Sequence, residues 1–251
     1  MIKIVLFEEH PPRGSLAIAG FPGMGLVGKT VAEYLIRKFN AKHIASVFCT
    51  GFPAHLIVRS GGSTSLIKVD VYYVDGVSDG IFIVTSDAQP MEDVYQNELS
   101  HTIVAFLKER GVKEVLAGAA YVTESIVASR RVFVAGSQGL VRMFMERVRA
   151  IPLEDGVISG MNGVIVGWAQ VEGLSAACIL GETWRSIVEF EYVDYGAAKV
   201  VLDAINAVYD LNLDTSELAD YASRIESEVM QKLGRLAKAS PEDRGRSYYI
   251  T

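Results

Sequence analysis

Short apolar runs of strand length alternate with longer stretches of helical period along most of the chain. Runs typical of buried strands cover residues 15–19, 44–49, 66–73, 80–85, 112–121, 131–135 and 176–180. Apolar residues recur with helical spacing over residues 26–39, 91–110, 140–149 and 164–173. Strands joined by helical crossovers favour a largely parallel sheet with helices on both faces. We therefore predict an α/β protein built as a three-layer α/β/α sandwich.

The C-terminal part of the chain has a different pattern, because two helices follow one another at residues 195–209 and 216–238. The apolar residues of the second helix form one stripe, made of Leu218, Tyr221, Ile225, Val229, Leu233 and Leu236. Such a stripe either packs on the helix's own domain or joins the same helix of another subunit. The opposite face mixes acidic and basic residues, which does not suit a membrane-binding helix.

A polar linker and a short aromatic end complete the chain. Residues 239–247 read Ala-Ser-Pro-Glu-Asp-Arg-Gly-Arg-Ser, and the last four residues are Tyr248, Tyr249, Ile250 and Thr251. We accordingly predict three parts. They are an α/β core domain at residues 1–210, an amphipathic helix within residues 211–238, and a flexible linker and tail at residues 239–251.

Composition narrows the class of protein. The chain has 251 residues, of which 50% are hydrophobic, so it can bury a sizeable core. It carries 24 Lys and Arg against 30 Asp and Glu, a net charge of −6, so we expect no nucleic-acid partner. The longest uncharged apolar runs, such as residues 115–122, fall short of the ~18 residues of a membrane span. Glu8 and Glu9 interrupt the N-terminal apolar stretch too early for a signal peptide.

Cysteine, histidine and serine positions predict no metal site and no catalytic centre. Cys49 and Cys178 match no metal or redox spacing and suit a reducing cytoplasm. No metal-ligand spacing relates the four histidines, His10, His43, His55 and His101. Ser125 and Ser137 lack the Gly-x-Ser-x-Gly pattern of hydrolases. We expect a cytoplasmic protein without catalytic residues, metal or cofactor.

Glycine is the residue type that carries the strongest signal. Five of the 23 glycines lie between Gly14 and Gly28, and five more between Gly156 and Gly173. Residues 20–30 read Gly-Phe-Pro-Gly-Met-Gly-Leu-Val-Gly-Lys-Thr. This stretch matches both the phosphate-loop pattern, with Lys and Thr at its end, and the dinucleotide fingerprint, and it lies between a predicted strand and a predicted helix.

Each nucleotide interpretation needs a second group elsewhere in the chain. A nucleoside triphosphatase needs an acidic residue at the end of another strand. The nearest candidate is Asp87, which Thr85 and Ser86 separate from the apolar residues 81–84. A dinucleotide site needs a carboxylate at the end of the next strand. That strand ends in Cys49-Thr-Gly, which contains no carboxylate. A third interpretation is a tight strand-to-helix turn whose glycines let backbones approach closely.

The glycine-rich stretch also resembles a family signature. Phe21-Pro-Gly-Met-Gly-Leu-Val-Gly28 is similar to the N-terminal signature of the proteasome assembly chaperone 2 family in its archaeal form. Later blocks of that family resemble residues 87–90, 159–164, 176–183 and 194–198, in the same order. The signature residues that we single out are Phe21, Pro22, Gly23, Gly25, Gly28, Asn162, Gly163 and Glu182.

The resemblance implies a fold and a function. The fold would be an α/β sandwich similar to nucleoside phosphorylases, without their catalysis. Family members are expected to form oligomers, and those of the archaeal branch to bind the α-subunit rings of proteasomes. The family pattern does not require Lys29-Thr30, so the resemblance disfavours the nucleotide interpretation.

The tail supplies a further hint about the partner. Proteins that bind proteasome rings often end in a hydrophobic residue, a tyrosine and one further residue. Here the penultimate residue is Ile250, and Tyr248 and Tyr249 come one position early. We predict that Tyr248, Tyr249, Ile250 and Thr251 form a partner-binding segment, although a frayed terminus is the simpler alternative.

One enzymatic alternative stays open besides nucleotide binding. Asp87, Asn162 and Glu182 are expected near the ends of parallel strands, where α/β sheets gather ligand groups. They would then line the pocket of a small-molecule hydrolase or phosphorylase. The competing interpretation is that Glu182 caps neighbouring backbone, as buried carboxylates commonly do.

Overall fold

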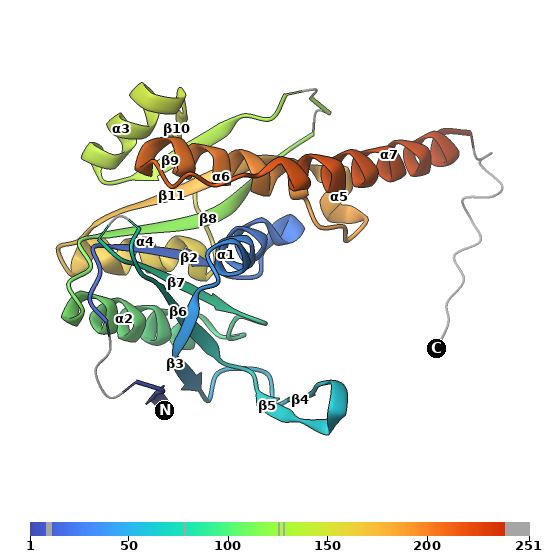
Figure 1. Cartoon of the computed structure of the whole chain (residues 1–251). Helices are drawn as coiled ribbons and strands as arrows, with labels where there is room; N and C mark the ends of the chain where they lie inside the picture. The colour runs from blue at the N-terminus through green and yellow to red at the C-terminus, as the bar shows by residue number, and fades with distance from the viewer. Residues whose placement is uncertain (9–11, 78, 125, 128, 239–251) are drawn as a thin grey trace.

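The computed structural model describes residues 1–8, 12–77, 79–124, 126–127 and 129–238 of the chain. Nine of the described strands form one sheet in the order β1-β3-β6-β7-β2-β8-β11-β9-β10 (Figure 1). In that order they are Ile2–Leu6, Lys42–Cys49, Val69–Val74, Ile81–Ser86, Leu16–Gly20, Glu114–Thr123, Ser175–Trp184, Val132–Gly136 and Ile151–Pro152. A separate two-stranded hairpin joins β4 (Leu56–Val58) to β5 (Thr64–Leu66).

Strand direction differs between the centre of the sheet and its flanks. The four neighbouring strands β7, β2, β8 and β11 are parallel. By contrast, β1, β3, β6 and β7 are joined by antiparallel pairings, as are β11 and β9. The predicted parallel arrangement is therefore found at the centre. A short connection without a crossover helix joins β6 to β7, as an antiparallel pair allows. At the other edge of the sheet, β10 pairs with β9 in the parallel direction.

Helices cover both faces of the sheet, which confirms the predicted three-layer sandwich. On one face, α2 (Asp93–Glu109) and α4 (Met161–Val171) contribute to one apolar core. On the other, α1 (Val27–Lys38), α3 (Gln138–Val148) and α6 (Tyr195–Tyr209) contribute to a second. Central strands are buried on both faces, so β7 is apolar almost throughout rather than alternating.

Two predicted element boundaries differ from the observed ones, and the differences change where signature residues lie. The helix expected at residues 164–173 begins at Met161, so Asn162 and Gly163 lie in its first turn. The strand expected to end at Leu180 continues to Trp184, so Glu182 lies inside β11 and not at its end. An acidic side chain is tolerated within this buried strand because arginine pairs with it, as described below.

The C-terminal helices have the predicted limits. Helix α7 spans Ser216–Lys238 and extends beyond the body of the protein (Figure 1). Its side chains Leu218, Ala222 and Val229 are buried against the same chain, whereas Met230 and Leu236 are exposed. Of the predicted apolar stripe, Leu218, Ile225, Val229 and Leu233 pack on the helix's own chain, whereas Tyr221 and Leu236 are exposed. The predicted tail at residues 239–251 lies outside the described residues.

Candidate functional site

The glycine loop, residues 20–28, connects β2 to α1 and is packed tightly into the protein. Gly25 has φ +57°, a conformation that favours glycine. A Cβ atom at Gly28 would lie 2.3 Å from the carbonyl oxygen of Gly118 on β8. Glycine at position 28 therefore allows α1 to approach the backbone of the sheet closely. These contacts support the interpretation of a tight strand-to-helix turn.

Side chains from two later signature blocks satisfy the backbone of this loop. The Phe21 amide donates to Asn162 Oδ1 at 2.8 Å, and Asn162 Nδ2 donates to the Phe21 carbonyl at 3.0 Å. The Gln89 amide group donates to the Pro22 carbonyl, while Gln89 Oε1 accepts from the Met161 amide at 2.7 Å. Buried backbone groups need such partners. The sequence blocks around residues 21, 89 and 162 thus form one packed unit.

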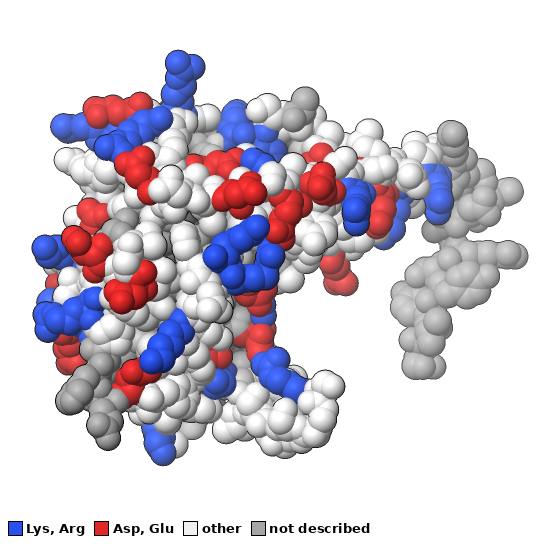
Figure 2. All heavy atoms as spheres, in the orientation of Figure 1, with Lys and Arg blue, Asp and Glu red and all other residues white. Residues whose placement is uncertain are grey.

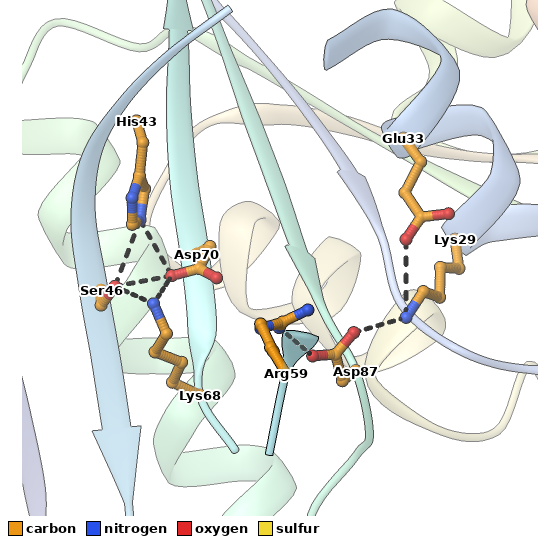
Figure 3. Close-up of polar contacts among 8 residues, drawn as sticks. All are labelled: Lys29, Glu33, His43, Ser46, Arg59, Lys68, Asp70 and Asp87. Atoms are coloured by element: carbon orange, nitrogen blue, oxygen red, sulfur yellow. Dashed lines mark hydrogen bonds and ion pairs between the residues drawn. The ribbon is translucent and has the colours of Figure 1, made fainter. Parts of the chain in front are cut away.

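The phosphate-loop residues point in different directions. Gly23 and Gly28 line a cleft of about 930 Å³, whereas Lys29 and Thr30 line a separate recess. Lys29 Nζ, which the nucleotide interpretation assigns to phosphates, instead binds Asp87 Oδ1 at 2.8 Å, and Asp87 also binds Arg59 at 3.3 Å (Figure 3).

The loop is also packed against the first turn of α6. The Asp194 amide donates to the Gly25 carbonyl at 2.8 Å, and a Cβ atom at Gly25 would lie 3.0 Å from Asp194 Cβ. This arrangement disfavours both nucleotide interpretations.

The 930 Å³ cleft lies where the parallel strands of the sheet end. Its base includes Tyr121 and the buried Phe133, whose ring centroids lie 4.0 Å apart, and its outer wall is the segment of residues 151–160. Of the three residues proposed for a hydrolase or phosphorylase, only Asn162 lines the cleft. Its side chain is already bonded to Phe21 at both ends. The structure does not bring Asp87 and Glu182 into this cleft.

Glu182, whose side chain is fully buried on β11, instead pairs with Arg131, whose side chain is half exposed. Arg131 donates from Nη2 to Glu182 Oε1 at 2.6 Å and from Nε to Oε2 at 2.9 Å, and its amide donates to Oε2 at 3.0 Å. The hydrogen bonds of the Arg131 side chain hold the pKa of the Glu182 carboxyl below its ordinary value. The interpretation of Glu182 as a backbone cap is therefore confirmed, and Arg131 is the partner that the sequence pattern did not show.

A second arginine that the sequence analysis missed lies next to this pair. Arg130 Nη1 donates to Asp194 Oδ2 at 2.7 Å and to the Glu182 carbonyl at 2.9 Å. Arg130 Nη2 donates to Glu226 Oε1 on α7 at 2.8 Å. The side chains of Arg130 and Asp194 are only 5% and 1% exposed, so both charges are withdrawn from water. Arg130 precedes β9 in a polar connection without a recognisable pattern.

A third polar cluster lies on strands β3 and β6 (Figure 3). Asp70 Oδ1 accepts hydrogen bonds from Lys68 at 2.6 Å and Ser46 at 2.6 Å, and lies 2.9 Å from His43 Nε2. Ser46 is fully buried, so its hydroxyl is closed to a substrate. The cluster therefore serves the structure of this flank of the sheet.

Asp70 gives stability that depends on pH. Burial tends to raise its pKa, but hydrogen bonds from His43, Lys68 and Ser46 outweigh burial and hold the pKa below its ordinary value. A lowered folded-state pKa adds stability above pH ~4, and this contribution is lost as pH falls through the folded pKa. Asp70→Asn should therefore cost about 1–3 kcal/mol at pH 7. In urea titrations the difference from the parent should shrink below pH ~4, and a pH-independent difference would contradict this assignment.

The described residues contain no group of three or more His, Cys, Asp or Glu side chains placed to hold a metal ion. None of their helices combines the length and the apolar character needed to cross a membrane. On the face shown in Figure 2, acidic and basic side chains are intermingled.

Fold and site together define an α/β sandwich whose glycine loop is a packing element. The model of the PAC2 family matches residues 17–233, so the chain belongs to the PAC2 family. The resemblance noted in the sequence is thereby confirmed.

Individual relatives match almost the whole chain. The Methanocaldococcus jannaschii protein MJ1210 is 25% identical, and the match covers 97% of both chains. The crystal structure of Pyrococcus furiosus PbaB, an archaeal proteasome activator, is 27% identical with a TM-score of 0.82, and the match covers 93% of this chain and 98% of PbaB. Pyrococcus furiosus PbaA, an archaeal homologue of proteasome-assembly chaperone, shares the fold at 24% identity and a TM-score of 0.75, over 94% and 93% of the two chains.

Proposed function

We propose that this protein is a cytoplasmic, non-enzymatic proteasome assembly chaperone or activator that self-associates and binds proteasome α-subunit rings. The similarity to the archaeal proteasome activator PbaB, over almost the full length of both chains, carries this proposal. The signature residues favour it over an enzyme, because the glycine loop is occupied by its own hydrogen bonds. The three candidate catalytic residues Asp87, Asn162 and Glu182 also have separate structural partners.

The C-terminal helix and tail would make part of the contact with the ring. Helix α7 extends away from the body and carries both signs of charge along its surface (Figures 1 and 2). The 13 residues at 239–251 follow it and span up to about 45 Å when extended. Tyr248, Tyr249, Ile250 and Thr251 would then enter pockets of the ring with the terminal carboxylate. Met230 and Leu236, exposed on α7, are candidates for contacts between copies.

Removing residues 248–251 tests the tail. We expect the deletion to weaken binding to an isolated α-subunit ring at least about tenfold, since it removes two aromatic side chains and an isoleucine from the proposed contact. Surface plasmon resonance with an immobilised ring measures the change. The matched control is Asp243→Asn within the linker, which should leave the affinity within about twofold. Equal affinity of the deletion variant and the full chain would refute the tail assignment.

A further inference from the structure

The described contacts connect the glycine loop to helix α7 through Arg130. We infer that Arg130 is a positioning residue, which sets the direction of the arm, the helix Ser216–Lys238, relative to the core. This inference concerns the geometry of the arm. Only its consequence for ring binding rests on the proposed function.

The first link joins the loop to Asp194. The Asp194 amide donates to the Gly25 carbonyl of the loop, and the Asp194 carboxylate accepts from the Ala197 amide at 2.9 Å and from the Thr183 hydroxyl. Asp194 is the N-cap of α6, so it fixes the first turn of that helix against the loop. The carboxylate is 1% exposed and held on several sides. It is a rigid point of attachment.

The second link is the guanidinium of Arg130, which bridges the core and the arm. It lies over the ring of Trp184, with Cζ 4.6 Å from the ring centroid, and against Gly196, where a Cβ atom would approach Arg130 Nε to 2.6 Å. Nη1 of the guanidinium donates to Asp194 and to the Glu182 carbonyl, and Nη2 donates to Glu226. A planar fork fixes direction as well as distance, which the ammonium of a lysine does not.

The other contacts of the arm explain why this link decides its direction. At the base of the arm, Glu217 pairs with Arg37 and Lys38 of α1 at the surface, where ion pairs are weak. Further along, Val229 packs on Trp184 and Ile187 in a small apolar cluster. Apolar contact is not directional. The bond from Arg130 to Glu226 lies between these two regions; it is partly buried, with Arg130 5% and Glu226 33% exposed, and it is directional.

Distances between spin labels on the arm and the core test the inference. Labels at Gly139→Cys and Gly234→Cys occupy positions where an added Cβ atom would meet nothing within 4 Å, on α3 and near the end of the arm. Cys49→Ser removes the partly exposed native thiol, whereas Cys178 is buried. Double electron–electron resonance should give one narrow distance distribution for the parent. Arg130→Lys should broaden that distribution at least about twofold or shift its maximum.

Matched variants separate this effect from general damage. Glu226→Gln removes the charge of the partly exposed Glu226 on the arm and should also broaden the distribution. This variant tests the inference even if Arg130→Lys does not fold. Arg185→Lys, in an exposed pair with Glu124, and Glu228→Gln, exposed on the arm, should leave it unchanged. Circular dichroism confirms folding of each variant. Unchanged distributions in Glu226→Gln and in folded Arg130→Lys would overturn the inference, whatever the tail deletion shows.

Discussion

Replacing Arg130 with alanine should lower the free energy of unfolding by about 3–5 kcal/mol, because removal of one partner leaves a buried charge uncompensated. Asp194 would keep the Thr183 hydroxyl and the Ala197 amide but lose its cation, with almost no access to water. The Glu182 carbonyl would lose a donor as well. Urea denaturation at pH 7, followed by circular dichroism, measures the change from the shift in midpoint.

The control for this prediction is another arginine in an ion pair. Arg185 binds Glu124 at 2.5 Å, but both side chains are more than half exposed. Arg185→Ala should therefore cost no more than about 1 kcal/mol. If the two alanine variants were equally stable, the buried network around Arg130 would contribute little to the fold.

Phe21→Ala should destabilise the protein by a similar amount, about 3–5 kcal/mol. Phe21 is fully buried in the core beneath α2 and α4, and its backbone is bonded on both sides to Asn162. Truncation would leave a cavity that the pinned loop cannot collapse to fill. Thermal and urea unfolding of the purified variant test this expectation.

An exposed residue of the same loop provides the comparison. Met24 is 56% exposed, so Met24→Ala should change the free energy of unfolding by no more than about 0.5 kcal/mol. A small effect of Phe21→Ala would mean that the loop repacks, and that the signature phenylalanine is retained for another reason.

Periodicity in the sequence predicted the layers of the fold and its long helices well. The helices at residues 195–209 and 216–238 have the predicted limits because their apolar stripes are long and regular. Short elements such as β10 (Ile151–Pro152) and α5 (Arg185–Glu189) contain too few residues for any period to show. The antiparallel flanks depend on which strands become neighbours, and the order of apolar runs does not determine that.

The candidate site was harder to predict. The sequence pattern indicated Asn162 and the glycine loop, which the structure does bring together. It did not show that Gly23 and Lys29 line different hollows, because a linear motif contains no information on side-chain direction. Arg130 gave no signal, since its partners Asp194 and Glu226 lie 64 and 96 residues away in the chain.

Because α7 is long, a small rotation near its contact with Arg130 displaces its far end by several ångströms. Twelve residues separate Glu226 from Lys238, so the helix continues for about 18 Å beyond the contact with Arg130. A tilt of about ten degrees at that point would displace the end of the helix by roughly 3 Å. The tail is long enough to span such a displacement, so an arm whose direction is less fixed would still allow contact. It would lower the effective concentration of the tail near its binding site. The ring would then be bound less tightly because of this lower effective concentration. In an oligomer that engages one ring through several tails, the reduction would apply to each tail.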